Sequence, residues 1–224
     1  GGFAACLMAE PALVGDCVAA LKDAVALPVT VKCRIGIDEA DPETMLFGFV
    51  EAVAARGCET FVVHARKAWL KGLSPKQNRE VPPLDYALVR RLKQARPDLT
   101  IVLNGGLTLD LALEHLAWAD GAMLGRAAYQ EPWSLAAVDR RVFGAPTPLA
   151  SRAEAVEALV RLAERHCAAG RPLKLLARHT LGLMNGLPGA RAWRRVLSEG
   201  MTDRAAGPEL FRQAAAPVRF DDAV

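Results

Sequence analysis

The stretch that decides the fold runs from residue 99 to residue 126 and reads LTIVLNGGLTLDLALEHLAWADGAMLGR. Residues 100–103 and 120–124 are short apolar runs that predict two β-strands, and glycine follows each run. Residues 109–118 are predicted to form a helix between them, capped by Thr108. Glycine lets a phosphate approach the backbone closely, and a helix N-terminus offers free N–H groups. The pattern is therefore typical of a phosphate site on consecutive strands, or else of two ordinary strand-to-helix turns.

The sequence before this stretch repeats the alternation of short apolar runs and helical segments. Strands are predicted at residues 29–33 and 60–63, with helices over residues 43–56 and 84–95. Such alternation favours a parallel sheet, and a closed (β/α)8 barrel needs eight strands in about 250 residues. With four strands before about residue 145, the chain holds either a small open sheet or half of a barrel.

The sequence after residue 150 changes character, and no further strand is predicted there. Residues 146–148 form a linker, and Ser151 begins a capping box that predicts a long helix. Further helices are predicted over residues 173–183, 190–197 and 208–215. We therefore predict an α/β domain in residues 1–145 and a small all-α domain in residues 146–224.

Composition limits the classes of protein to which the chain can belong. The net charge of +3 permits an anionic partner without requiring one. The chain has no run of about 20 apolar residues and no visible signal peptide, so a cytoplasmic protein without membrane contact is expected. The five cysteines show neither a CxxC pair nor a metal-ligand spacing, so we expect reduced thiols and no metal site. The chain begins at Gly1 in what reads as a loop, which indicates a fragment of a longer protein.

Polar or glycine residues stand at the end of every predicted strand, namely Lys32, His64, Asn104 and Gly125. In α/β proteins the carboxyl ends of parallel strands line the binding crevice. A lysine and a histidine facing a phosphate site are typical of a site for a phosphorylated cofactor, and Arg126 can add a bidentate phosphate contact. The alternative is a lysine that extends from a strand end into solvent and a histidine with a purely structural role.

Basic residues gather near tryptophans in two parts of the sequence. The long segment of residues 67–83 contains Trp69, and the helical region contains Trp193. The basic residues are Lys67, Lys71, Lys76 and Arg79 in the first part and Arg178, Arg191, Arg194 and Arg195 in the second. Basic groups interleaved with aromatic rings suit a nucleic-acid backbone and unstacked bases, although a solvated basic surface gives the same pattern.

Five strings in the sequence carry a family resemblance. They are PVTVKCRIG at 28–36, FVVHARKAWLKGLSPKQNREVPPLDY at 61–86, LNGG at 103–106, GAMLGRAAYQEPW at 121–133 and GARAWRRVLSEG at 189–200. On these strings the chain resembles the tRNA-dihydrouridine synthases, specifically the bacterial A-type subgroup. The resemblance extends to about residue 205, and the second string is the most specific to the subgroup.

The resemblance implies an FMN enzyme with a (β/α)8 barrel, a C-terminal helical domain and a monomeric state. Such enzymes use NADPH to reduce the C5–C6 double bond of a uridine in the D-loop of tRNA, at position 20 and in some cases 20a. By motif match, Lys32 and His64 contact the flavin. The residues implied to bind the phosphate end of FMN are Asn104, Gly105, Gly106, Gly125 and Arg126. The residues implied to contact tRNA are Lys76, Arg79, Arg191 and Arg194.

The resemblance also implies a proton-donating cysteine, in an NVGCPS-like motif that would precede Gly1. Cys6, in the string AACLM, matches the segment after that motif and is not given this role, so no catalytic residue is assigned. The four predicted strands would then be barrel strands five to eight. The alternatives are another FMN barrel oxidoreductase that acts on a small molecule, and a protein that binds tRNA or FMN without catalysis.

Overall fold

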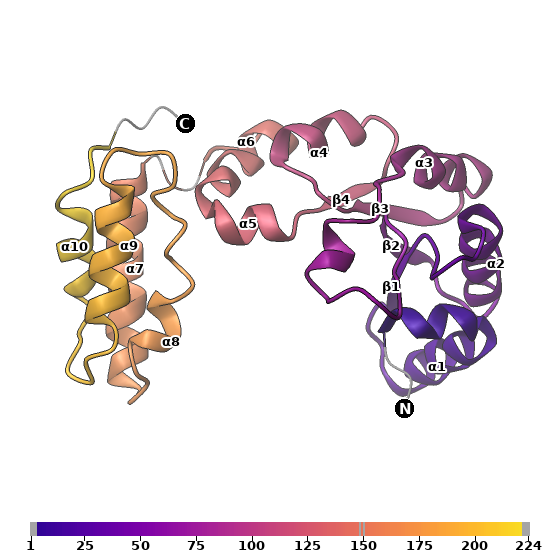
Figure 1. Ribbon diagram of the computed structural model, residues 1–224, viewed down its shortest axis with the longest axis horizontal. Helices are drawn as coiled ribbons and strands as arrows, with labels where there is room; N and C mark the ends of the chain where they lie inside the picture. Colours follow the sequence, from indigo (N-terminus) through magenta and orange to yellow (C-terminus); the bar gives the residue numbers. More distant parts are fainter. Residues whose placement is uncertain (1–3, 148, 150, 221–224) are drawn as a thin grey trace. The chain divides into compact units, whose positions relative to one another are not determined.

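The computed structural model describes residues 4–147, 149 and 151–220, and the chain forms two compact units (Figure 1). The first unit is Gly1–Gly125 and the second is Arg126–Val224. The division therefore falls earlier than the domain boundary predicted at residue 145. The physical reason is that hydrogen bonds join the segment after β4 to the helical unit. One of them runs from Asn185 Nδ2 to the carbonyl oxygen of Gln130, at 2.7 Å. Part of the predicted linker, residue 148, lies outside the described residues.

The first unit is built on a parallel sheet whose four strands are adjacent in chain order. The strands are β1 (Thr30–Arg34), β2 (Thr60–His64), β3 (Thr100–Asn104) and β4 (Gly121–Met123). The helices of this unit are η1 (Ala4–Ala9), α1 (Pro11–Ala24), α2 (Pro42–Ala54), η2 (Gln77–Arg79), α3 (Tyr86–Ala95) and α4 (Leu109–His115). The predicted α/β class with a parallel sheet is confirmed.

Strands β1, β2 and β3 pair with one another without an offset in register. Thr30, Thr60 and Thr100 are register partners at one end, and Arg34, His64 and Asn104 are partners at the other. Because side chains alternate between the two faces of a strand, each such row lies on one face of the sheet.

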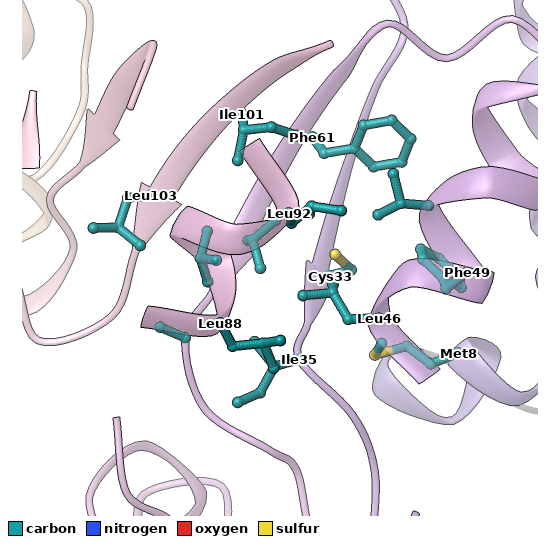
Figure 2. Packing of buried hydrophobic residues seen from close by; sticks show 14 of the residues in the cluster. Met8, Cys33, Ile35, Leu46, Phe49, Phe61, Leu88, Leu92, Ile101 and Leu103 are labelled. Atoms are coloured by element: carbon teal, nitrogen blue, oxygen red, sulfur yellow. The ribbon is translucent and has the colours of Figure 1, made fainter. Parts of the chain in front are cut away.

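The hydrophobic core lies between one face of the sheet and helices α1, α2 and α3 (Figure 2). Phe61 and Ile101 from the strands are fully buried there with Leu46 of α2 and Leu88 of α3. Each fully buried side chain of this size contributes about 1.5–3 kcal/mol relative to leaving it exposed. The core thus fixes which face of the strands remains for other contacts.

The second unit contains only helices among its described residues. They are α5 (Arg126–Gln130), η3 (Pro132–Ala137), α6 (Val138–Phe143), α7 (Arg152–Ala168), α8 (Lys174–Ala177), α9 (Ala190–Gly200) and α10 (Leu210–Ala215). The hydroxyl oxygen of Ser151 accepts from the backbone N–H of Glu154 at 3.2 Å, as the predicted cap requires. The helix predicted over residues 173–183 is shorter than expected, because α8 covers only its first part.

The core of the second unit is centred on Trp193, which is fully buried. Its ring packs against Phe211 with a centroid distance of 6.2 Å, and its indole N–H donates to the carbonyl oxygen of Thr180 at 3.2 Å. The sequence reading that grouped Trp193 with basic residues as an RNA-facing aromatic is therefore wrong for this ring. Along the described part of the chain, no helix is both long enough and apolar enough to cross a membrane.

Candidate functional site

On the face of the sheet opposite the core, each row of register partners includes a polar side chain. Lys32 lies on this face in register with Val62 and Val102, and the next row along contains His64 and Asn104. Lys32 is exposed, whereas the neighbouring Cys33 points into the core. Because successive side chains of β1 point to opposite faces, the Lys32 ammonium lies on the open face and the Cys33 thiol lies in the apolar core.

Asn104 connects three strands at their carboxyl ends. The Lys32 ammonium donates to Asn104 Oδ1 at 3.0 Å, and Asn104 Nδ2 donates to the carbonyl oxygen of Met123 at 2.7 Å. The structure therefore brings together two predicted site residues that are 72 positions apart. Partial burial lowers the pKa of Lys32 below its ordinary value, and the nearby charge of Arg34 lowers it further. An anion bound beside this ammonium would offset both effects.

The turn after Asn104 depends on two glycines in the left-handed region. Gly105 has φ of 118° and Gly106 has φ of 65°, so both positions disfavour any residue with a Cβ. A Cβ on Gly105 would lie 2.7 Å from Cδ2 of His64 and 3.0 Å from Cδ2 of Leu84. The backbone of this turn therefore lies against the His64 ring and leaves no room for a side chain.

The helix after this turn is shorter than the sequence predicts. The Thr108 hydroxyl oxygen accepts from the backbone N–H of Leu111 at 3.3 Å, which confirms the predicted cap. However, α4 has only seven residues, where the pattern predicts a helix over 109–118. Of the two glycines in the turn before this helix, Gly106 is exposed and Gly105 is buried.

The second glycine position, Gly125, is the last residue of the first unit, and Arg126 is the first residue of the second. A Cβ on Gly125 would meet nothing within 4 Å, so the backbone there is open. Arg126 begins α5 and is exposed. The two predicted phosphate contacts are therefore neighbours in the chain at the point where the units divide.

The long segment of residues 67–83, here called loop 67–83, is organised by Asn78. Asn78 Oδ1 accepts from the backbone N–H of Trp69 at 2.7 Å, and its Nδ2 donates to the carbonyl oxygens of Trp69 at 2.8 Å and Leu73 at 3.3 Å. From β1, Arg34 Nη1 donates to the carbonyl oxygens of Asn78 at 2.9 Å and Lys67 at 3.2 Å. The loop thus has a defined conformation that is tied to the sheet.

Loop 67–83 holds two of the predicted tRNA contacts in exposed positions. Lys76 immediately precedes η2 and Arg79 ends it. Burial lowers the pKa of Arg34, and the charges of Arg79 and Arg66 lower it further, which indicates three guanidinium groups close together. Such a concentration of positive charge attracts an anionic polymer.

The other two predicted tRNA contacts lie on α9 of the helical unit. Arg191 and Arg194 are exposed, whereas Trp193 and Leu197 of the same helix are buried. Arg194 Nη1 donates to Asn185 Oδ1 at 2.8 Å, which fixes its direction. The amphipathic helix therefore presents its cations on the side opposite the core.

Comparison with known proteins adds an independent finding. The family described as dihydrouridine synthase (Dus) matches residues 1–218 of the chain. The chain belongs to the dihydrouridine synthase family. It is 51% identical over 222 residues to the tRNA-dihydrouridine(20/20a) synthase of Shewanella oneidensis, which covers 99% of this chain and 66% of the relative. It is 53% identical over 220 residues to that of Yersinia pestis, covering 97% of this chain and 64% of the relative. The chain thus spans about two thirds of the length of the curated relatives it matches.

Two cysteines of this dihydrouridine synthase family member, Cys33 and Cys58, are buried in the core and not on the open face of the sheet. Cys33 is buried in the core, where burial raises the pKa of its thiol to about 12. Burial also raises the pKa of Cys58. Cys6 lies in η1, and the other two cysteines lie on α1 and α7. Within the described ranges, no group of three or more histidine, cysteine and acidic side chains is arranged to hold a metal ion.

Two residues that organise this family member's candidate site had no role in the sequence analysis. Arg34 and Asn78 link β1 to loop 67–83, and they are 44 positions apart. Asparagine side chains in loops commonly form hydrogen bonds with the nearby backbone. No pattern in the sequence pairs it with Arg34, because that contact depends on the path of the loop.

Proposed function

We propose that the protein reduces uridine to 5,6-dihydrouridine in the D-loop of tRNA, at position 20 or 20a, with FMN as cofactor and NADPH as reductant. The observation that carries the proposal is the contact of Lys32 with Asn104 beside the Gly105 turn. A cation and an amide at neighbouring strand ends, followed by the exposed Gly106, suit a phosphorylated, redox-active ligand. The curated relatives cited above carry the name tRNA-dihydrouridine(20/20a) synthase, which supports the choice of substrate.

The residues at the strand ends fit FMN in charge and in shape. Gly106 is exposed, and a Cβ on Gly125 would meet nothing within 4 Å, so a phosphate can approach the backbone at both glycines. We assign Lys32 and His64 to the flavin ring. The phosphate end is assigned to Asn104, Gly105, Gly106, Gly125 and Arg126. When bound, FMN supplies the hydride chemistry.

The chain's own residues would position and stabilise the reacting groups. Lys32 places a positive charge where negative charge develops on a reduced ring. Asn104 holds that ammonium in place, because its amide is itself held by β4. The lowered pKa of Lys32 means that its proton is held less tightly than in solution, and a neighbouring anion would favour the charged form.

We propose that β1 to β4 are strands five to eight of a (β/α)8 barrel and that the helical unit is the C-terminal domain of the enzyme. Support comes from the parallel order of the strands and from the polar rows on the face opposite the core. We also propose that the proton donor is a cysteine outside this sequence. Two of the described cysteines support this, because Cys33 and Cys58 are buried in the apolar core of the first unit.

We propose that tRNA is bound by two separate sets of cations, Lys76 and Arg79 in loop 67–83 and Arg191 and Arg194 on α9. All four are exposed; Asn78 orders the backbone of the loop that carries the first set, and Asn185 accepts from the guanidinium of Arg194 in the second. Cations on a fixed backbone lose little conformational freedom when they bind phosphate.

The test of the proposed function uses the whole protein purified with its bound cofactor. We expect the absorption spectrum of a flavin and the NADPH-dependent appearance of dihydrouridine in unmodified tRNA, detected by mass spectrometry. Replacing Lys32 by Ala should reduce both. Replacing Lys174, an exposed lysine of the helical unit, should change neither. A protein without flavin, or with flavin content independent of Lys32, would overturn the assignment.

A further inference from the structure

A row of hydrogen-bonded side chains in the helical unit extends beyond the cations already assigned. We propose that Tyr129, together with His179 and Arg178, forms an additional RNA contact in which the Tyr129 ring stacks on an unpaired base and Arg178 binds the adjacent phosphate. This inference rests on the proposed function and names a part of the tRNA-binding surface. The three residues lie at the end of α5 and just after α8.

The Tyr129 ring is available for stacking because it is held in place and 58% exposed. Its hydroxyl lies 3.0 Å from Nδ1 of His179, and the two rings meet edge to face with centroids 5.8 Å apart. A large exposed aromatic ring that is fixed at its hydroxyl end loses little freedom when it binds. Stacking on such a ring tolerates any base, because every base has a π face.

The hydrogen bond from Arg178 assigns the roles of the two ring nitrogens of His179. Arg178 Nε donates to His179 Nε2 at 2.9 Å, and arginine cannot act as an acceptor. Nε2 is therefore the acceptor in this arrangement, which corresponds to the tautomer with its proton on Nδ1. Nδ1 in turn donates to the Tyr129 oxygen. The hydrogen of the Tyr129 hydroxyl is left to donate to a partner outside the row.

The charge of Arg178 is also oriented toward an external partner. Only its Nε is used within the described part of the chain, and the side chain is exposed. The two terminal NH2 groups of the guanidinium are thus available to an anion, and arginine is well suited to bidentate contact with phosphate. The row therefore offers a stacking ring, a hydroxyl donor and a cation side by side.

The row is continuous with Arg194, which is already proposed to contact tRNA. Asn185 joins them, since its Oδ1 accepts from Arg194 and its Nδ2 donates to the carbonyl oxygen of Gln130, the residue after Tyr129. The approach is close, because a Cβ on Gly182 would lie 2.1 Å from that same carbonyl oxygen. Arg194 is therefore linked through Asn185, by two hydrogen bonds, to the residue next to Tyr129.

The experiment measures binding of unmodified tRNA to the whole FMN-loaded protein by fluorescence anisotropy over a series of NaCl concentrations. Tyr129→Ala should weaken binding roughly tenfold with an unchanged salt slope, because a stacked base carries no charge. Tyr129→Phe should stay within about threefold of the unchanged protein, since the ring remains. Arg178→Gln should weaken binding and lower the salt slope by roughly 0.7–0.9.

The controls are Phe143→Ala, which removes another exposed aromatic ring, and Arg204→Gln, which removes another exposed arginine. Neither should change binding, and flavin content and melting temperature should be the same in all five variants. If Tyr129→Ala destabilises the fold, Arg178→Gln still tests the row. Unchanged binding in Tyr129→Ala and Arg178→Gln, with weaker binding in Arg191→Gln and Arg194→Gln, would overturn this inference alone. If none of these variants changes tRNA binding, the proposed function fails with it.

Discussion

The strand ends of the first unit and the exposed helix faces of the second use polar residues in opposite ways. At the strand ends, Lys32 and Asn104 bind each other, and Gly105 leaves no space for a side chain beside His64. In the helical unit, Arg191 and Arg194 extend from a helix whose other side is buried. The first arrangement selects a ligand by shape, and the second selects it by charge. Substitutions should therefore have large, local effects in the first region and small, additive effects in the second.

The largest effect is expected from Gly105→Ala, which tests whether shape determines binding at the strand ends. The new Cβ would clash with His64 at 2.7 Å in addition to the strain of a positive φ, which costs about 1–2 kcal/mol. We expect loss of bound flavin, measured by absorbance of the purified protein, and a lower melting temperature.

Gly72→Ala is the matched control for this substitution. Gly72 also has a positive φ, but a Cβ there meets nothing within 4 Å. This variant should show the backbone strain alone and keep its flavin. Equal flavin content in the two variants would show that the space beside His64 does not belong to the cofactor site.

The next largest effect is expected from Lys32→Met, which keeps the apolar stem and removes the charge. A hydrogen bond to a charged group contributes about 1.5–3 kcal/mol, so FMN affinity should fall roughly 10- to 150-fold. Titration of the cofactor-free protein with FMN, followed by flavin fluorescence, measures this change. If the FMN affinity of the variant stays within twofold of that of the unchanged protein, Lys32 does not contact the cofactor.

The lowered pKa of Lys32 also predicts a dependence of stability on pH. The folded protein releases this proton more readily than the unfolded chain, in which lysine has a pKa near 10.5. The unfolded state therefore binds more protons just below pH 10.5, and the contribution of Lys32 to the free energy of unfolding rises with pH in that window. Urea unfolding of the cofactor-free protein should show this rise, and Lys32→Met should reduce it.

A smaller effect is expected from Asn78→Ala, which removes the three side-chain hydrogen bonds that organise loop 67–83. The KM for tRNA should rise roughly tenfold, while kcat and flavin content stay unchanged, because the loop carries Lys76 and Arg79 but no proposed flavin contact. Leu70→Ala, which changes an exposed apolar side chain of the same loop and removes no side-chain hydrogen bond, is the control and should have little effect. A change in kcat without a change in KM would contradict a positioning role for Asn78.

The smallest effects are expected from Lys76→Gln, Arg79→Gln, Arg191→Gln and Arg194→Gln taken singly. Each lost phosphate contact should reduce the slope of log K against log salt by roughly 0.7–0.9. Flavin content should not change in any of them. A slope that stays constant in the loop variants but falls in the α9 variants would restrict the RNA surface to the helical unit.

The sequence predicts the sheet well because its signals are local. The apolar runs before His64 and Asn104, and the glycines after Asn104, are visible without any knowledge of the fold. Parallel strands place their carboxyl ends together, so the meeting of Lys32 with Asn104 follows from the topology.

Other features depend on contacts between distant parts of the chain, and the sequence did not predict them. The bond from Arg34 to Asn78 and the burial of Trp193 are both set by tertiary packing. The predicted boundary rests on the prolines at 146–148, whereas the hydrogen bond from Asn185 to Gln130, which ties α5 to the helical unit, has no signal in the sequence.

We propose that the strand ends of the first unit hold the flavin with which the protein reduces tRNA. The most direct measurement incubates the whole FMN-loaded protein, and its Gly105→Ala variant, with NADPH and unmodified tRNA, and maps dihydrouridine by mass spectrometry. We predict dihydrouridine at position 20 or 20a that requires NADPH and is lost in the variant. Full modification by a Gly105→Ala protein, or none by the flavin-loaded unchanged protein, would contradict the account.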